Sequence, residues 1–325
     1  MYDYIDQMQA DGINAMVIIP LYPQFSISTS GSSLRILQEI FYKNPEVWGP
    51  DKVAHTVVPS WYHRKGYVEA MAQLCIKEII KYSESEMRQG LHVLFSAHGV
   101  PQSYIEAGDP YQRQIEECVK LVSSEVSSIL TDPLRRPVEI SQEQCNLLAS
   151  GDTAVEYHLS FQSRVGPVQW LRPYTEETLE TMGANGVKNL IVVPVSFVSE
   201  HVETLEEIDM EYKELAEENG ITNWRRVPAL NTDEIFINDM ADLVIEALES
   251  PAISVAEAQA SSDMAQDSAL ESRLGASNLN SKKAFDIEKN AGFFVFLGII
   301  GYELLHGHPL AAVSSLLQQL HVLNV

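Results

Sequence analysis

The sequence has few cysteines and few basic residues for its length of 325 residues. Its three cysteines stand far apart and form no CxxC pair, so neither a disulfide framework nor a cysteine-rich metal site is expected. Lysine and arginine number 22 against 45 aspartate and glutamate residues, a formal charge of −23. A nucleic-acid partner needs a basic face and is therefore not expected. The acidic balance suits a cationic ligand such as a metal ion, and it suits simple solubility equally well.

The familiar motifs of nucleotide and hydrolase chemistry are also missing. The sequence contains no GxxxxGK[ST] phosphate loop, no GxGxxG after a predicted strand, no GxSxG nucleophile elbow and no HExxH zinc motif. Nucleotide hydrolysis and dinucleotide-dependent redox chemistry are therefore not indicated. No signal peptide or transit segment is visible, which predicts either a cytosolic protein or a chain that lacks its true N-terminus.

Strand-like apolar segments alternate with amphipathic segments along residues 13–249. The predicted strands cover residues 13–19, 53–58, 91–95, 156–162, 189–197 and 224–230. The predicted helices cover residues 3–11, 33–42, 65–82, 109–130, 175–184, 203–219 and 233–249. This alternation predicts an α/β fold in which parallel strands are covered by helices on both faces.

Three segments do not fit the alternation. Residues 131–152 read as an inserted surface loop, and residues 250–281, rich in alanine and serine, read as a flexible linker. An uncharged apolar run follows at 291–302. It is shorter than the roughly 20 residues of a membrane span, so it is either a tethered membrane helix or a helix that docks on the main domain.

Polar and aromatic residues gather where the predicted strands end. They are Tyr22, Trp61, His98, Arg164, Trp170, Glu200 and His201. Open α/β sheets bind ligands at the carboxyl ends of their strands, so these positions predict a cleft. His98 alone has two readings, a hydrogen-bonded structural residue or a functional one. The hydroxyl residues at 28–33 also have two, a helix N-cap or an anion site.

The predicted helix 203–219 carries an acidic stripe. At 100° per residue, five glutamates fall within an arc of about 80°: Glu203, Glu207, Glu211, Glu214 and Glu218. The opposite side is apolar, as in an amphipathic helix. One reading of the stripe is a solvated face, and the other is a path for a divalent cation. His201 and Glu200, at the junction of strand and helix, favour the second reading by adding an imidazole and a carboxylate.

Five segments of the sequence stand out together, at 21–34, 95–101, 108–111, 162–171 and 195–209. In this order they resemble ferrochelatases of the plant, algal and cyanobacterial type. The tail loosely resembles the light-harvesting-like extension of these photosynthetic enzymes, although the arginine of that motif is missing. The resemblance implies two Rossmann-like domains with a porphyrin cleft between them. It also implies insertion of Fe2+ into protoporphyrin IX to form protohaem.

The resemblance carries over onto particular residues. It implies that His98 and Glu203 are catalytic, with His98 acting as a base or as the first metal ligand, and the sequence leaves both roles open. The implied metal-binding residues are His98, His201, Glu203, Glu207 and Glu211, and the implied porphyrin-binding residues are Trp170, Ser96, Tyr22 and Ser30. Fe2+ is then a substrate, and no resident cofactor or iron–sulfur cluster is expected.

The resemblance also predicts the domain organisation. Residues 1–50 would be a remnant of the first chelatase domain, 51–249 the second domain, 250–287 a linker and 288–325 a light-harvesting-like, membrane-associated helix. The family's usual first strand is missing, so we expect an N-terminally truncated chain with weak or no activity. The expected location is the chloroplast, at a thylakoid or envelope membrane. The sequence leaves open whether the chain forms a homo-oligomer. Two alternatives remain: a non-catalytic isoform that binds metal or pairs with another subunit, and a cobalt chelatase acting on a sirohydrochlorin-type ring.

Overall fold

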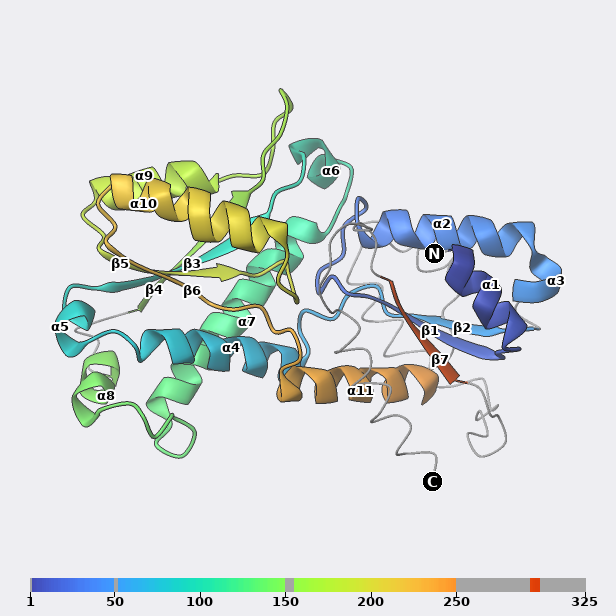
Figure 1. The fold of residues 1–325 in the computed structure, drawn as a ribbon, viewed down its shortest axis with the longest axis horizontal. Coiled ribbons are helices and arrows are strands. Elements are labelled where there is room, and N and C mark those ends of the chain that lie inside the picture. Colours follow the sequence, from blue (N-terminus) through green and yellow to red (C-terminus); the bar gives the residue numbers. More distant parts are fainter. Residues whose placement is uncertain (1, 50–51, 150–154, 250–292, 299–325) are drawn as a thin grey trace. The chain divides into compact units, whose positions relative to one another are not determined.

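The computed structural model describes residues 2–49, 52–149, 155–249 and 293–298. The chain forms two compact units (Figure 1). The first comprises Met1–Trp61, Tyr104–Tyr111 and Ile237–Val325, and the second Tyr62–Ser103 and Gln112–Phe236. Each unit contains a parallel sheet flanked by helices. The predicted α/β fold class is therefore confirmed.

The sheet of the first unit has β1 (Ala15–Pro20) at its centre. Its order is β2-β1-β7, with β2 at Ala54–Val57 and β7 at Phe293–Gly298, and both neighbours run parallel to β1. All six residues of β1 are buried, as expected for a central parallel strand that is covered on both faces. The helices of this unit are α1 (Tyr2–Ala10), α2 (Ser30–Lys43), α3 (Pro45–Trp48) and most of α11 (Glu234–Glu249).

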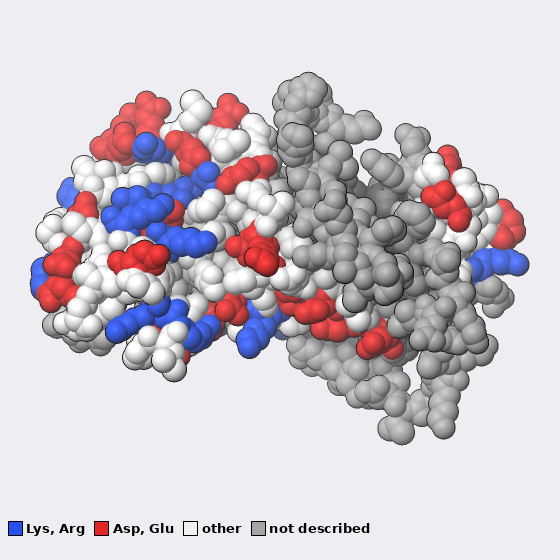
Figure 2. Space-filling view, turned by 60° about the horizontal axis from the view of Figure 1, so that its bottom comes forward, with Lys and Arg blue, Asp and Glu red and all other residues white. Residues whose placement is uncertain are grey.

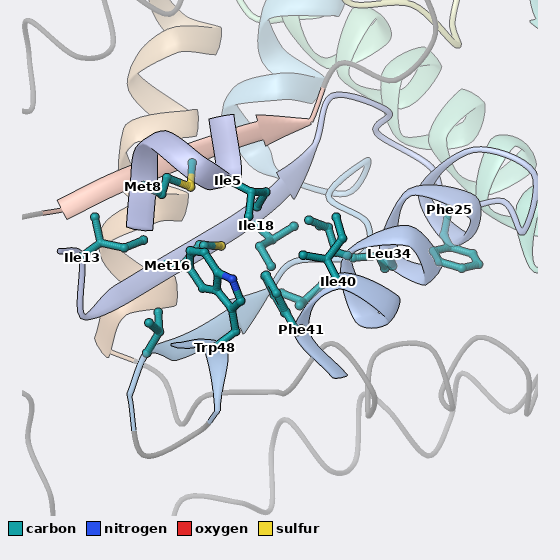
Figure 3. Packing of buried hydrophobic residues seen from close by; sticks show 13 residues of the cluster. Ile5, Met8, Ile13, Met16, Ile18, Phe25, Leu34, Ile40, Phe41 and Trp48 are labelled. Atoms are coloured by element: carbon teal, nitrogen blue, oxygen red, sulfur yellow. The ribbon is translucent and has the colours of Figure 1, made fainter. Parts of the chain in front are cut away.

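The core of the first unit forms where α1 and α2 pack against β1 (Figure 3). Leu34, Leu37, Ile40 and Phe41 recur at helical spacing along α2 and are buried, so one face of this helix points into the core. The ring of Phe41 stacks on that of Trp48, with 5.2 Å between their centroids. This packing holds α2, whose first residue is Ser30.

Two features of the first unit differ from the sequence prediction. Residues 293–298 form strand β7 next to β1, where the sequence predicts a hydrophobic helix. The segment Phe-Phe-Val-Phe-Leu has high strand propensity, and it pairs one side of β1 that would otherwise be an open edge. Strand β2 pairs with β1 in this unit, whereas the predicted boundary at residue 50 assigns it to the second domain. The rest of the predicted linker and tail lies outside the described residues.

The sheet of the second unit has four parallel strands in the order β4-β3-β5-β6. These are β3 (Leu91–His98), β4 (Val155–Gln162), β5 (Asn189–Pro194) and β6 (Asn223–Arg226). The register pairs Ser96 with Ser160 and His98 with Gln162. The carboxyl ends of β3, β4 and β5 therefore meet at one rim of the sheet, as the alternating sequence predicts.

Helices cover both faces of this second sheet (Figure 1). One face carries α9 (Thr175–Ala184), the helix η1 (Glu203–Tyr212) and α10 (Lys213–Glu218), whose apolar residues share a buried core with Leu94 and Val192 of the sheet. The other face carries α4 (Lys65–Ile79) and α7 (Tyr111–Thr131). Two short helices, α5 (Glu84–Met87) and α6 (Gln102–Glu106), lie in the connections.

Part of the predicted inserted loop 131–152 is helical. Helix α8 (Gln142–Ala149) lies within it, and Cys145 and Leu147 of this helix are buried. The side chain of Gln144 donates hydrogen bonds to the carbonyl oxygens of Ile80 and Tyr82 at 3.1 and 2.9 Å. These long-range contacts stabilise a helix that the polar sequence does not predict.

The structure also shows where the charged residues and the cysteines lie. Figure 2 shows acidic and basic side chains interspersed over the described part of the visible face. None of the three cysteines, Cys75, Cys118 and Cys145, forms a disulfide within the described part of the chain, and all three are buried. Within the described ranges, no helix is both long and apolar enough to cross a membrane.

Candidate functional site

His98 is the last residue of β3 and lies at the carboxyl rim of the second sheet. Its backbone N–H donates to Oγ of Ser196 at 3.0 Å, which ties the end of β3 to the segment after β5. The ring of Phe197 neighbours both His98, at 6.3 Å between centroids, and His201, at 3.9 Å. The structure therefore gathers two of the predicted metal-binding residues around one aromatic side chain.

Trp170 is held beside the segment that follows His98. It forms an antiparallel bridge with Pro101, and its Nε1–H donates to the carbonyl oxygen of Val165 at 2.8 Å. A Cβ atom at Gly99 would lie 2.9 Å from the carbonyl oxygen of Gln162 and 3.2 Å from the Trp170 ring. Only a glycine permits this close approach of the two segments, so the predicted porphyrin-lining residue Trp170 lies close to His98 in the fold.

A chain of buried polar side chains runs beneath the rim. Oγ of Ser96 donates to Oε1 of Gln162 at 2.6 Å, and the hydroxyl of Thr175 lies 3.2 Å from Ser96 and 3.0 Å from Ser160. Ser96 itself is 0% exposed. In this structure Ser96 orients Gln162 from below, while its predicted contact with porphyrin stays a prediction.

The chain of hydrogen bonds ends on the acidic stripe. Nε2 of Gln162 donates to Oε2 of Glu207 at 3.3 Å, and Oγ of Ser163 donates to the same oxygen at 2.7 Å. Ser163 has a φ of 62°, a left-handed conformation that is uncommon outside glycine and occurs preferentially at functional sites. Glu207 is thus fixed relative to Gln162, whose register partner on β3 is His98.

The first three glutamates of the stripe lie on a π-helix, where the sequence predicts an α-helix, and Glu214 and Glu218 lie on α10. Residues Glu203–Tyr212 form η1, and the α-helical hydrogen bonding resumes only in α10. A π-helix has about 4.4 residues per turn, so positions four apart are offset by roughly 33° around its axis, against roughly 40° in an α-helix. Glu203, Glu207 and Glu211 therefore still lie on one side of the helix, within a slightly narrower arc than the sequence predicts. The side chain of Glu203 lies outside the described part of the chain.

The carboxylates on this face affect the ionisation of Tyr212. Burial raises the pKa of the Tyr212 phenol, and the negative charges of Glu176, Glu207 and Glu211 raise it further.

The exposure of the glutamates changes along the stripe. Glu207 is half-buried, whereas Glu211, Glu214 and Glu218 are exposed. The described carboxylates of the stripe are therefore exposed from Glu218 to Glu211, and only Glu207, which is hydrogen-bonded at the rim, is half-buried.

Glu200 is not available as the additional metal ligand that the sequence suggests. Both of its oxygens accept from Nη1 of Arg226, at 2.9 and 3.1 Å, and it also accepts from the backbone N–H of Ala229 and the hydroxyl of Thr204. Burial alone would raise the pKa of Glu200, but the hydrogen bonds from Ala229 and Arg226 lower it overall. Glu200 is therefore an ionised residue that anchors the start of η1.

Tyr22 and Ser30 belong to the first unit, whereas the other predicted site residues belong to the second. The loop before α2 is organised by Asp109, whose Oδ2 accepts from Oγ of Ser26 at 2.8 Å and from the N–H of Ile27 at 3.0 Å. Its Oδ1 accepts from the N–H of Tyr111 at the start of α7. Asp109 therefore accepts from a backbone N–H at the start of α7 and also anchors the loop before α2.

Several residues of the rim were missed by sequence reasoning. Gln162, Ser163 and Thr175 connect the strand ends to Glu207. Gln162 and Ser163 lie in the segment 162–171, but a strand end and a loop carry no local signal of a hydrogen bond to a helix about 45 residues away. Only the packing of η1 over the end of β4 shows their role.

The fold and the rim together define a class of protein. It is an α/β protein with parallel sheets, in which two histidines and a π-helix bearing carboxylates share the carboxyl edge of one sheet, where open α/β sheets bind their ligands. The family model described as Ferrochelatase matches residues 1–248. The chain belongs to the ferrochelatase family.

Curated relatives agree with this assignment. Ferrochelatase of Nostoc punctiforme is 49% identical over 255 residues, which cover 78% of this chain and 58% of that protein. Ferrochelatase of Synechococcus elongatus is 52% identical over 248 residues, 76% of this chain and 56% of that protein. Ferrochelatase-2, chloroplastic, of Arabidopsis thaliana is 50% identical over 245 residues, 75% of this chain and 42% of that protein. The chain thus spans about half the length of the curated relatives it matches.

Proposed function

We propose that this chain acts as a protohaem ferro-lyase, inserting Fe2+ into protoporphyrin IX to form protohaem. The observation that carries the proposal is the single rim that gathers His98, His201 and Glu207. Phe197 neighbours both histidines, and Glu207 is bonded to Gln162, which pairs with His98 across the strands. Imidazole and carboxylate are ligands that suit Fe2+.

The reaction explains why such groups would share one site. Fe2+ enters the macrocycle as two pyrrole N–H protons leave it, so a base must accept those protons one after the other and pass them to solvent. An imidazole titrates near neutral pH and suits this role. We propose that His98 is the base or the first metal ligand, and that Glu203, Glu207 and Glu211 carry the metal ion to it. Trp170, Ser96, Tyr22 and Ser30 remain the proposed contacts of the porphyrin, and Ser96 also supports Gln162.

The location and partners are proposals of the same kind. Relatives from Arabidopsis thaliana and Oryza sativa carry the word chloroplastic in their names, which supports a plastid location for this chain. Association with a membrane and assembly into an oligomer stay predictions. Weak or absent turnover by this chain also stays a prediction.

The test is metal insertion by the purified full chain, measured under anaerobic conditions from the loss of free protoporphyrin fluorescence. We expect turnover that His98→Ala abolishes and Glu207→Gln lowers at least tenfold. Glu180→Gln is the matched control, because Glu180 is an exposed carboxylate on α9 and lies outside the acidic stripe. Equal turnover by wild type and His98→Ala would refute the proposal.

The two alternatives give different results in the same experiment. A non-catalytic isoform would bind Fe2+ or Zn2+ with a dependence on His201 and Glu207 but show no turnover. A cobalt chelatase would insert Co2+ into a sirohydrochlorin-type ring faster than Fe2+ into protoporphyrin. Either outcome would replace the proposed activity while leaving the family assignment unchanged.

A further inference from the structure

A second group of metal-ligating side chains lies at the opposite end of β3. His92 near the start of β3 pairs in register with Glu156 of β4. Side chains two residues apart on a strand share a face, so His158 lies on the same side of the sheet as Glu156 and His92. One ligand atom from each residue lies within 4.8 Å of the others.

We propose that His92, Glu156 and His158 bind a borderline divalent cation of the Zn2+ class. Nδ1 of His92 and Nε2 of His158 are 3.1 Å apart, and Oε2 of Glu156 is 3.7 Å from the first and 3.9 Å from the second. With bonds of about 2.0–2.2 Å, the edges of a tetrahedral zinc site measure roughly 3.3 Å. The three ligand atoms match these edges to within about 0.6 Å.

Hydrogen bonding alone does not satisfy this arrangement. Burial lowers the pKa of the His92 imidazole and also that of His158, while the nearby Glu156 charge opposes the change. In its neutral form, each imidazole carries only one ring proton. If one imidazole donates its N–H to the other, the nitrogen that accepts this hydrogen bond has no proton left to donate to the adjacent Glu156 oxygen. A divalent cation accepts all three lone pairs at once, and neutral imidazole is the form that binds metal.

The degree of exposure allows an ion to enter. The side chains of His92 and His158 are 15% and 32% exposed, while that of Glu156 is 62% exposed. The two imidazoles are thus held by the sheet, and the carboxylate lies at the surface. Such a site leaves a fourth position for water, as open zinc sites do.

The site is separate from the rim and independent of the proposed ferro-lyase activity. His92 and His98 are six residues apart on the same strand, which corresponds to about 20 Å. One ion cannot contact both ends. Since β4 is the edge strand of the sheet, an ion shared by His92, Glu156 and His158 would link that edge to its neighbour β3 and stabilise the second unit.

The experiment uses the full chain carrying His98→Ala and His201→Ala, which removes both imidazoles of the rim. We expect this background to bind one Co2+ with the intense visible absorption of four-coordinate cobalt, and to bind Zn2+ in competition with a chromophoric chelator. Adding His158→Gln should weaken Zn2+ binding at least a hundredfold. Adding Glu156→Gln should weaken it at least tenfold, whereas Glu180→Gln, a change of an exposed carboxylate on α9, should leave it unchanged.

A second measurement separates loss of the site from loss of the fold. Zn2+ should raise the melting temperature of the background by several degrees and leave that of the His158→Gln variant unchanged, while both melt alike in chelator. If His158→Gln fails to fold, the comparison of Zn2+ affinity between Glu156→Gln and Glu180→Gln tests the proposal alone. Equal Zn2+ affinity in background and variants, or no binding beyond weak surface association, would overturn the proposal.

Discussion

Replacement of Arg226, at the end of β6, is the sharpest test of the contacts that fix η1 at the rim of the second sheet. Its Nη1 donates to both oxygens of Glu200, and its Nε donates to Oδ1 of Asp209 at 2.6 Å. Asp209 lies on η1 and Glu200 lies just before it. Replacing Arg226 by Met keeps the apolar stem but leaves two carboxylates without their shared cation.

The size of the effect follows from burial. Removing one partner of a buried ion pair costs about 3–5 kcal/mol of unfolding free energy. The side chains of Glu200 and Asp209 are 25% and 35% exposed, so water screens part of the exposed charge. We therefore expect Arg226→Met to lower the free energy of unfolding by about 2–3 kcal/mol. Glu200→Gln keeps part of the hydrogen bonding and should cost about 1.5–2 kcal/mol.

Urea unfolding followed by tryptophan fluorescence measures both variants, and the double variant completes a mutant cycle. The matched control is Arg113→Met, because Arg113 pairs with Glu117 at 3.3 Å but both side chains are 40% or more exposed. That control should change stability by about 0.5 kcal/mol or less. If Arg226→Met cost no more than the control, the account of Arg226 as the anchor of η1 would be wrong.

The same pair predicts a dependence on pH. The folded-state pKa of Glu200 lies below its ordinary value of 4.5, because the hydrogen bonds from Ala229 and Arg226 outweigh the opposite effect of burial. A lowered pKa means that the ionised form stabilises the fold above pH 4.5 and that this stabilisation is lost as pH falls through the folded pKa. The stability difference between wild type and Glu200→Gln should therefore shrink between pH 7 and pH 3. A constant difference over this range would contradict the assignment.

Two further variants test the close contacts around the rim and the loop before α2. Gly99→Ala places a Cβ 2.9 Å from the carbonyl oxygen of Gln162. We expect urea unfolding to show a loss of about 1–3 kcal/mol in the free energy of unfolding. An unchanged midpoint would show that the two segments can separate freely. Asp109→Asn removes an acceptor shared by Ser26 and Ile27. We expect the free energy of unfolding to fall by about 1–3 kcal/mol and proteolysis within residues 21–34 to become faster. An unchanged cleavage rate would argue against Asp109 as the anchor of that loop.

Local patterns predicted much of the fold. The apolar run of β1 and the alternating segments identify the strands and their parallel arrangement, because burial on both faces demands a continuous apolar sequence. The same reasoning places His98 at the end of β3 and puts the acidic stripe on a helix. These features depend on residues close together in the chain, so the sequence by itself contains the information.

Other features depended on the tertiary structure. The π-helical form of η1, the capture of Glu200 by Arg226 and the hydrogen bonds from Gln162 to Glu207 all involve partners that are distant in sequence or differ from standard helical geometry. The pairing of β7 with β1 and the approach of His92 to His158, 66 residues apart, depend on strand order and register. Periodicity reports which face of a segment is apolar, but not which segment packs against it. That choice is made by the packing of the whole unit.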